Sequence, residues 1–179
     1  MVVLHLDLSR LRILLADDSA FMRRLVRSLL NGIGIRSVIE AEDGAAALEA
    51  FEQNEIDIII TDWVMPVFDG LELTQAVRDP QSKNPHIPIL MLSAHAELSR
   101  VILARDGGVN GFLTKPISAK RLRLHLESCV LNPRALAPAS RSPIGEQDDT
   151  SSSGMLDATA QDTTVEDTTL EDDLTLGSV

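Results

Sequence analysis

Short apolar runs alternate with amphipathic stretches along the first 132 residues of the chain. Five apolar runs are compact enough to predict buried strands, and the stretches after them have apolar positions at helical spacing. The predicted strands are 11–15, 38–41, 56–61, 87–92 and 111–113. The predicted helices are 19–30, 44–53, 69–78, 98–105 and 118–131. Strands and helices that alternate in this way favour one parallel sheet with helices on both faces.

The third apolar run supports a parallel sheet most directly. It contains Ile58, Ile59 and Ile60 in succession and does not alternate between apolar and polar residues. A strand with this pattern is expected to be buried on both faces, which is typical of parallel sheets. The sequence therefore predicts an α/β fold with a doubly wound, five-stranded parallel sheet in a (βα)5 arrangement.

The first and last predicted helices have apolar stripes at helical spacing. In the first helix the stripe consists of Phe21, Leu25 and Leu29, and two nearby glycines, Gly32 and Gly34, are predicted to end the helix. In the last helix the residues expected to face the core are Leu122, Leu126 and Val130, whereas Leu124 is expected to be exposed.

Charge divides the chain at Asn132. Residues 1–132 hold 14 Lys and Arg against 17 Asp and Glu, whereas residues 133–179 hold 2 against 10. The second segment contains no aromatic residue and is rich in Ser, Thr, Asp and Glu. Such a composition cannot bury enough apolar surface to offset chain entropy, so we expect residues 133–179 to form a disordered acidic tail.

Composition also bears on partners and location. A nearly neutral domain with an acidic tail lacks the positive surface that nucleic-acid binding requires. The single cysteine, Cys129, is compatible with a reducing compartment. No apolar run approaches the ~20 residues that span a bilayer, and the first residues lack the apolar core of a signal peptide. We therefore expect a soluble cytoplasmic protein without a membrane span and without a nucleic-acid partner.

Polar residues follow the predicted strands where the strands end. Asp17 and Asp18 follow the first strand, Asp62 the third, Ser93 the fourth and Lys115 the fifth. Because the carboxyl ends of parallel strands meet at one edge of a sheet, these side chains are expected to converge there. Clustered carboxylates repel one another, and Mg²⁺ relieves that repulsion. A carboxylate can also act as a nucleophile and form an acyl phosphate, with an ammonium group and a hydroxyl stabilising the phosphoryl charge.

Each of these residues also has an ordinary structural interpretation. Asp17, Asp18 or Ser19 could cap the following helix, and Ser93 could close a turn. Asp62 could be a common loop carboxylate, and Lys115 a surface lysine. It is their joint position at strand ends that favours a functional site over these alternatives.

Four sequence motifs make the chain resemble the receiver domains of bacterial two-component response regulators. They are ILLADDS at 13–19, DWVMP at 62–66 followed by Asp69-Gly70, MLSA at 91–94 and GFLTKP at 111–116. The resemblance covers residues 9–131 and implies a flavodoxin-like fold, with residues 133–179 as a separate tail.

The resemblance implies a role for each residue of the acidic site. Asp62 would be the phosphoacceptor. Mg²⁺ would be held by Asp17, Asp18 and Asp62 together with the backbone carbonyl of Val64. Lys115 would contact the phosphoryl oxygens.

The resemblance also implies a switch. Ser93 would hydrogen-bond the phosphoryl group, and Phe112 would turn inward as Ser93 moves. The peptide bond between Lys115 and Pro116 would be cis. Phosphorylation would change the surface formed by the last two helices and the strand between them, where a downstream protein would bind.

The resulting hypothesis is a stand-alone receiver that is not an enzyme. It would take a phosphoryl group from a sensor histidine kinase or a histidine phosphotransfer protein and act through protein contacts, as a chemotaxis-type regulator or as a phosphorelay intermediate. A Mg²⁺-dependent aspartyl phosphohydrolase is disfavoured, because Val64 stands where such enzymes place a second aspartate. A flavodoxin-like nucleotide binder is disfavoured because the first loop is acidic and the chain has no glycine-rich loop.

Overall fold

The computed structural model describes residues 6–95 and 97–132, and the acidic tail expected at 133–179 lies outside these residues. Five strands and five helices alternate along the described part of the chain, as the sequence predicts. The strands are β1 (Arg12–Ala16), β2 (Ser37–Ala41), β3 (Ile58–Asp62), β4 (Ile89–Ser93) and β5 (Gly111–Thr114). The helices are α1 (Ala20–Ile33), α2 (Gly44–Gln53), α3 (Gly70–Val77), α4 (Leu98–Asp106) and α5 (Ala119–Leu131).

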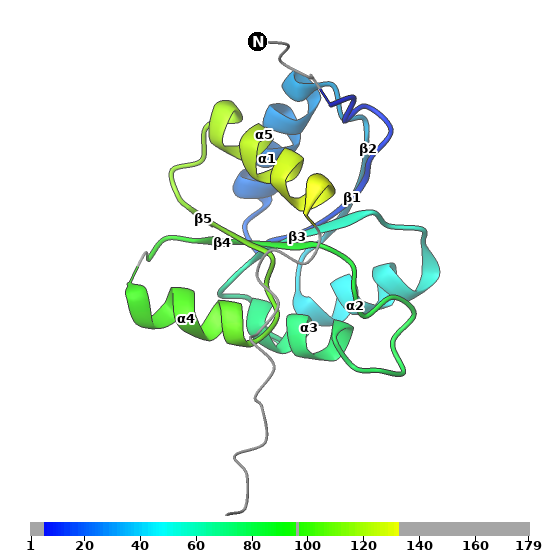
Figure 1. The fold of residues 1–179 in the computed structure, drawn as a ribbon, viewed down its shortest axis with the longest axis vertical. Helices are drawn as coiled ribbons and strands as arrows, with labels where there is room; N and C mark the ends of the chain where they lie inside the picture. The colour runs from blue at the N-terminus through cyan, green and yellow to red at the C-terminus, as the bar shows by residue number, and fades with distance from the viewer. Residues whose placement is uncertain (1–5, 96, 133–179) are drawn as a thin grey trace, which may run out of the picture. The chain divides into compact units, whose positions relative to one another are not determined.

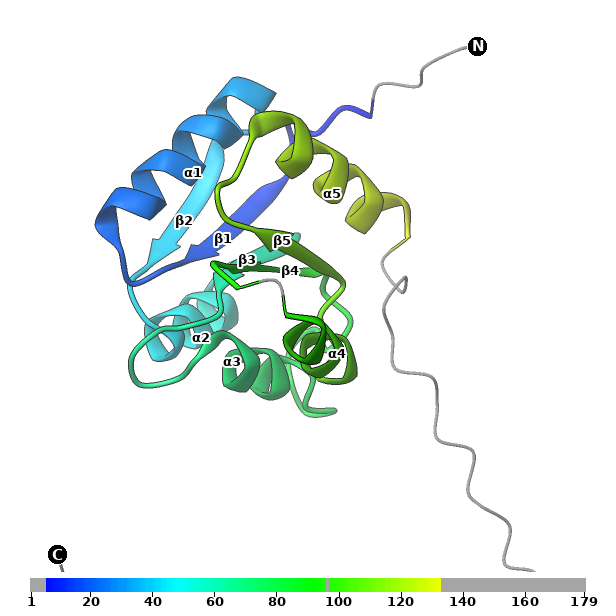
Figure 2. The ribbon, with the colours of Figure 1, turned by 90° about the vertical axis from the view of Figure 1, so that its left-hand side faces the viewer.

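The strands form one parallel sheet in the order β2-β1-β3-β4-β5. Helices α1 and α5 cover one face of the sheet, and α2, α3 and α4 cover the other (Figures 1 and 2). This arrangement confirms the flavodoxin-like fold. Within the described part of the chain, no helix combines the length and the apolar character needed to cross a membrane.

Alternate residues of the strands feed two hydrophobic cores, one on each face of the sheet. Ile58 and Ile60 pack with α1 and α5, whereas Ile59 packs on the opposite face with α2 and α3. All three isoleucines are buried, which confirms that the third strand is covered on both faces.

The stripe that predicts α1 does not form its buried face. The side chain of Phe21 is 67% exposed, and the buried residues of the helix are Val26 and Leu30. Gly32 lies inside the helix, so its predicted role in ending the helix is wrong. Gly34 alone forms the C-cap, with φ at 105° and its N–H donated to the carbonyls of Leu30 and Asn31.

One residue of the predicted core face of α5 is misplaced. Val130 is 37% exposed, and the third buried position belongs to Cys129. The buried residues Leu122, Leu126 and Cys129 follow a spacing of four and then three, which keeps them on one side of a helix with 3.6 residues per turn. Leu124 is exposed, as predicted.

Arg78 forms hydrogen bonds to two loop segments near the amino ends of β4 and β5. Its guanidinium donates to the carbonyl of Gly108 at 3.0 Å, to the carbonyl of Pro85 at 2.8 Å and to Oδ1 of Asn110 at 2.7 Å. The same Asn110 oxygen accepts the N–H of Ile89 at 2.8 Å, at the start of β4. Burial lowers the pKa of Arg78 to about 10. This arginine therefore links the end of α3 to the turn before β5.

Replacement of Arg78 by Met is expected to lower the free energy of unfolding by about 3 kcal/mol, because partly buried acceptors lose charged donors. The measurement is urea unfolding, with Arg24→Met as the control. Arg24 is exposed on α1, and its variant should stay within about 0.5 kcal/mol of the wild type. Equal unfolding midpoints for the two variants would contradict the proposed structural role.

Candidate functional site

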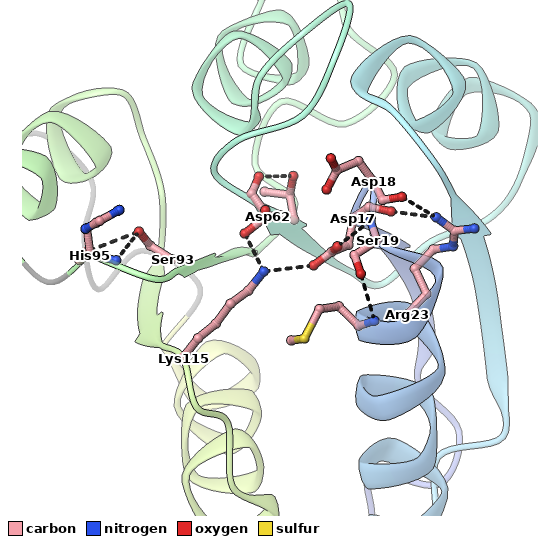
Figure 3. A network of polar contacts seen from close by, with 10 residues as sticks. Asp17, Asp18, Ser19, Arg23, Asp62, Ser93, His95 and Lys115 are labelled. Carbon is pink, nitrogen blue, oxygen red and sulfur yellow. Dashed lines mark hydrogen bonds and ion pairs between the residues drawn. The ribbon is translucent and has the colours of Figure 1, made fainter.

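Three strands deliver charged side chains to one edge of the sheet. Asp17 follows β1, Asp62 ends β3 and Lys115 follows β5. The Lys115 Nζ lies 3.0 Å from Oδ2 of Asp17 and 2.8 Å from Oδ1 of Asp62, as Figure 3 shows. The structure thus brings these three predicted residues into direct contact, although β5 is separated from β1 by two other strands.

Asp18 completes an acidic cluster with Asp17 and Asp62. One carboxylate oxygen from each of the three residues lies within 4.8 Å of the others. Asp17 is fully buried, Asp62 nearly so, and Asp18 is exposed, so the cluster opens to solvent on one side. Carboxylate oxygens gathered with access to water suit a hard divalent cation such as Mg²⁺, which keeps several water ligands.

For both Asp62 and Lys115, burial shifts the pKa in one direction and hydrogen bonding shifts it in the other. Burial raises the pKa of the Asp62 carboxyl, and the hydrogen bond from Lys115 offsets only part of this rise. For Lys115, burial acts to lower the pKa of the ammonium group, but the hydrogen bonds to Asp62 and Asp17 outweigh it and leave the pKa raised. The ammonium group is therefore held in its charged form between two carboxylates.

The loop between β1 and α1 holds Asp17 in place. Its Oδ1 accepts the N–H of Ser19 at 2.9 Å, and its backbone carbonyl accepts from Arg23 at 2.7 Å. Ser19 is the N-cap of α1, where its hydroxyl accepts the N–H of Met22. Asp17 and Asp18 therefore do not cap the helix. Arg23 is not predicted from the sequence, because nothing in the residues around it distinguishes it from the other arginines of α1.

Ser93 lies at the same edge but outside the charged network. Its hydroxyl accepts the N–H of His95 at 3.1 Å and donates to the carbonyl of His95 at 3.0 Å. Figure 3 shows this pair beside the cluster, with the hydroxyl turned into the loop before α4. The structure therefore places Ser93 near the acidic site but gives its hydroxyl a different partner.

Phe112 and Pro116 occupy the neighbouring strand and its end. Phe112 is partly buried in β5 and meets Trp63 edge to face, with ring centroids 6.3 Å apart. The Lys115–Pro116 peptide bond is cis, as the resemblance implies. Val64, the residue whose carbonyl was expected to bind metal, lies in the loop between β3 and α3 with an exposed side chain.

Gly70 allows α3 to begin against the backbone of Asp62. Its N–H donates to the carbonyl of Trp63 at 2.8 Å, and a Cβ at this position would overlap the backbone oxygen of Asp62. The side chain of Asp69 caps the helix through the N–H groups of Leu71 and Glu72. The capping residue thus fixes where α3 starts, and the glycine lets that start lie against the end of β3.

Val67 has an unusual backbone conformation in the same loop. Its φ is +67°, and it is the one residue other than glycine with positive φ in the described part of the chain. A β-branched side chain is strained in this left-handed region. The side chain is 70% exposed, so packing does not compensate for the strain.

Comparisons with known proteins point to one family. The model of the response regulator receiver domain matches residues 13–127. Chemotaxis protein CheY of Pseudomonas aeruginosa is 38% identical over 117 residues, which are 65% of this chain and 94% of that protein. Chemotaxis protein CheY-3 of Vibrio cholerae is 37% identical over 117 residues, covering 65% of this chain and 89% of that one.

Solved structures show the same likeness. A response regulator receiver domain protein from Clostridium thermocellum aligns with a TM-score of 0.62 at 27% identity, covering 70% of this chain and 98% of its own. The chemotaxis protein CheY4 of Vibrio cholerae aligns with a TM-score of 0.61 at 34% identity, covering 65% of this chain and 96% of its own.

Replacement of Gly70 by Ala is expected to lower the free energy of unfolding by about 2 kcal/mol, because the added methyl group must displace the backbone of Asp62. Gly32→Ala is the matched control, since a Cβ there meets nothing within 4 Å. That variant should be more stable than the wild type by about 0.5 kcal/mol, as for other helical glycines. Urea unfolding distinguishes the two, and a Gly70→Ala protein as stable as Gly32→Ala would disprove the close approach.

Replacement of Val67 by Asn is expected to raise the free energy of unfolding by about 1 kcal/mol, because Asn tolerates the left-handed conformation. Val64→Asn serves as the control, since Val64 is also an exposed valine in this loop but does not have positive φ. Its stability should change little. The same urea titration tests this pair, and an equal gain in both variants would show that polarity rather than strain is responsible.

Proposed function

The chain belongs to the response regulator receiver family, and on that premise we propose that it accepts a phosphoryl group on Asp62 and signals as a stand-alone receiver. The observation that carries the proposal is the contact of Lys115 with Asp62 and Asp17 at the edge of the sheet. The match spans 94% of the Pseudomonas relative. That relative therefore consists of little beyond this domain, which supports action through protein contacts.

The proposed reaction transfers a phosphoryl group from a phosphohistidine to Asp62. A carboxylate oxygen of Asp62 forms the new bond to phosphorus while the bond from phosphorus to the histidine nitrogen breaks, and the nitrogen keeps that electron pair. Lys115 is close enough to Asp62 to form an ion pair with the negatively charged phosphoryl group once it is attached. Because the ammonium group is already positioned at 2.8 Å, it can stabilise this charge with little reorganisation.

The acidic cluster fits a magnesium ion. Asp17, Asp18 and Asp62 would hold it, with the backbone carbonyl of Val64 as a further ligand. When bound, Mg²⁺ supplies positive charge that offsets the phosphoryl oxygens. The chain's own contribution is to keep Asp17 oriented through Ser19 and Arg23.

The rim of the site suits a protein donor. Phe21 in the first turn of α1 and Val64, Val67 and Phe68 in the loop after β3 are all exposed apolar side chains. They come from the two segments that carry the acidic cluster. Exposed apolar groups beside a charged site are typical of protein contact surfaces. A sensor histidine kinase or a histidine phosphotransfer protein would therefore cover this rim while its phosphohistidine meets Asp62.

The output would leave through α4, β5 and α5. Once the phosphoryl group is present, Ser93 would exchange its bonds to His95 for a bond to a phosphoryl oxygen, and Phe112 would move with it. Helices α4 and α5 expose apolar side chains, among them Leu98 and Leu124, that a downstream partner could cover. The tail at 133–179 is proposed to remain a separate segment beyond a receiver domain at 9–131.

A signalling role is better supported than an enzymatic one. Receivers of this kind are generally signalling proteins, and Val64 occupies the position at which aspartyl phosphohydrolases carry a second aspartate. The proposal has two versions. In one, the chain passes the phosphoryl group to another protein, and in the other the phosphoryl group only switches a protein contact. In both versions we propose that the protein acts in the cytoplasm, where such donors act.

Incubation with Mg²⁺ and acetyl phosphate is expected to add the mass of one phosphoryl group to the wild type and none to Asp62→Asn. Acetyl phosphate replaces the phosphohistidine, so the bond between phosphorus and the acetate oxygen breaks and acetate leaves. Intact mass spectrometry gives the result. Hydroxylamine should remove the added mass, because it cleaves acyl phosphates.

Two controls define the outcome. Asp106→Asn removes an exposed carboxylate at the far end of α4 and should react like the wild type. Chelation of Mg²⁺ by EDTA should abolish the mass gain. A gain that persists in Asp62→Asn would assign the modification to another residue and overturn the proposal.

A further inference from the structure

Helix α4 is held to the rest of the domain by few contacts. Ala104 is its only buried residue, and its N-cap, Glu97, makes no side-chain capping bond. Two interactions among the described residues lie at its amino-terminal half and in the loop before it. One is the pair of hydrogen bonds between Ser93 and His95 in the preceding loop, and the other is the contact of Arg100 with Trp63.

Arg100 places its cationic guanidinium over the ring of Trp63, whose backbone is fixed. The Arg100 Cζ lies 5.4 Å from the centroid of the Trp63 ring. The backbone of Trp63 is held on both sides, since its N–H donates to Leu92 at 2.9 Å and its carbonyl accepts from Gly70 at 2.8 Å. Through Arg100, α4 therefore contacts a residue whose backbone is fixed and which directly follows Asp62.

Arg100 has an incomplete set of hydrogen bonds. Its NH1 nitrogen is buried and has no hydrogen-bond partner among the described residues. Attraction to the indole face is thus a main compensation for placing part of this guanidinium away from water. The other side of the contact is continuous with the switch region, because Trp63 meets Phe112 edge to face.

We propose that Arg100 is a positioning residue that holds α4 against Trp63 and so limits how far the helix moves when Asp62 is phosphorylated. The second part of this inference, the limit on helix movement after phosphorylation, rests on the proposed function. If Ser93 turns to the phosphoryl group, the bonds to His95 are lost, whereas the contact of Arg100 with Trp63 can still hold the amino-terminal half of α4. The strength of that tie then sets the equilibrium between the two positions of the helix.

Loss of the stacked cation is expected to shift this equilibrium by about two- to thirty-fold, the range that measured cation–π interactions imply. In the unphosphorylated Arg100→Met protein, amide hydrogens of α4 should exchange faster by a factor in this range. The resonance of the Lys115 amide, which donates to the carbonyl of Ser93 at 2.8 Å, reports the state of the end of β4. In the variant it should move part of the way toward its position in wild type treated with Mg²⁺ and beryllofluoride, a phosphoryl mimic.

Two further variants make the test specific. Arg105→Gln removes an exposed arginine from the same helix, one that pairs with Asp106, and should leave both readouts unchanged. Arg100→Lys keeps a cation near the ring and should give an intermediate effect, which also provides a result if Arg100→Met does not fold.

The outcomes separate this inference from the proposed function. Wild type that does not respond to beryllofluoride would contradict the proposed function, while the exchange rates of α4 would still test the tie. Exchange rates that are the same in Arg100→Met and Arg105→Gln would overturn the inference, even if Asp62 is phosphorylated. In the wild type, the Lys115 amide resonance has one position without beryllofluoride and another with it. If the resonance of Arg100→Met does not lie on the line between these two positions, Arg100 supports the fold without affecting the switch, and the inference is overturned.

Discussion

The contact of one ammonium group with two buried carboxylates organises the functional edge of this domain. Asp17 follows β1 and Asp62 ends the neighbouring β3, and two carboxylates so close would repel each other without a compensating cation. Lys115 comes from β5, which is separated from β3 by β4. Neighbouring strands lie about 4.8 Å apart, so the side chains of Lys115 and Asp62 together must bridge about 10 Å. Only a long cationic side chain at position 115 does this, and the sheet order therefore explains the length that the residue needs.

The sequence predicts the parts of the fold that depend on local pattern. Buried strands such as β3 have continuous apolar runs, and parallel pairing brings their carboxyl ends to one edge. Alternation therefore predicts that Asp17, Asp62 and Lys115 lie at the same edge, whereas their direct contact also depends on the strand order. The same reasoning fails for α1 at Phe21, because apolar periodicity identifies a helix but not which apolar side chain is buried. An exposed phenylalanine beside an acidic cluster breaks the usual relation between apolar character and burial.

Other features of the site arise from tertiary contacts that have no local signal. The approach of Gly70 to the backbone of Asp62 depends on how α3 meets β3. The stacking of Arg100 on Trp63 joins residues from two elements, and the sequence around Arg100 shows only a charged position on an amphipathic helix. The partner of Ser93 is equally unpredictable, because a hydroxyl at a strand end has several backbone groups within reach and the loop decides among them.

The two sides of the site differ in how firmly they are held, and this difference determines which side is expected to move after phosphorylation. On the side of β1 and α1, Asp17 is fixed by Ser19 and Arg23, and the helix is capped. On the side of β4 and α4, Ser93 bonds to His95 in the described part of the loop, the helix start has no side-chain cap, and the helix has a single buried residue. A new charge at Asp62 acts on its surroundings as a whole, but elements that are held less firmly require less free energy to move. Rearrangement is therefore expected on the side of α4, because α1 has a side-chain cap and two buried residues, and the residues that hold it do not include the serine that the phosphoryl group would recruit.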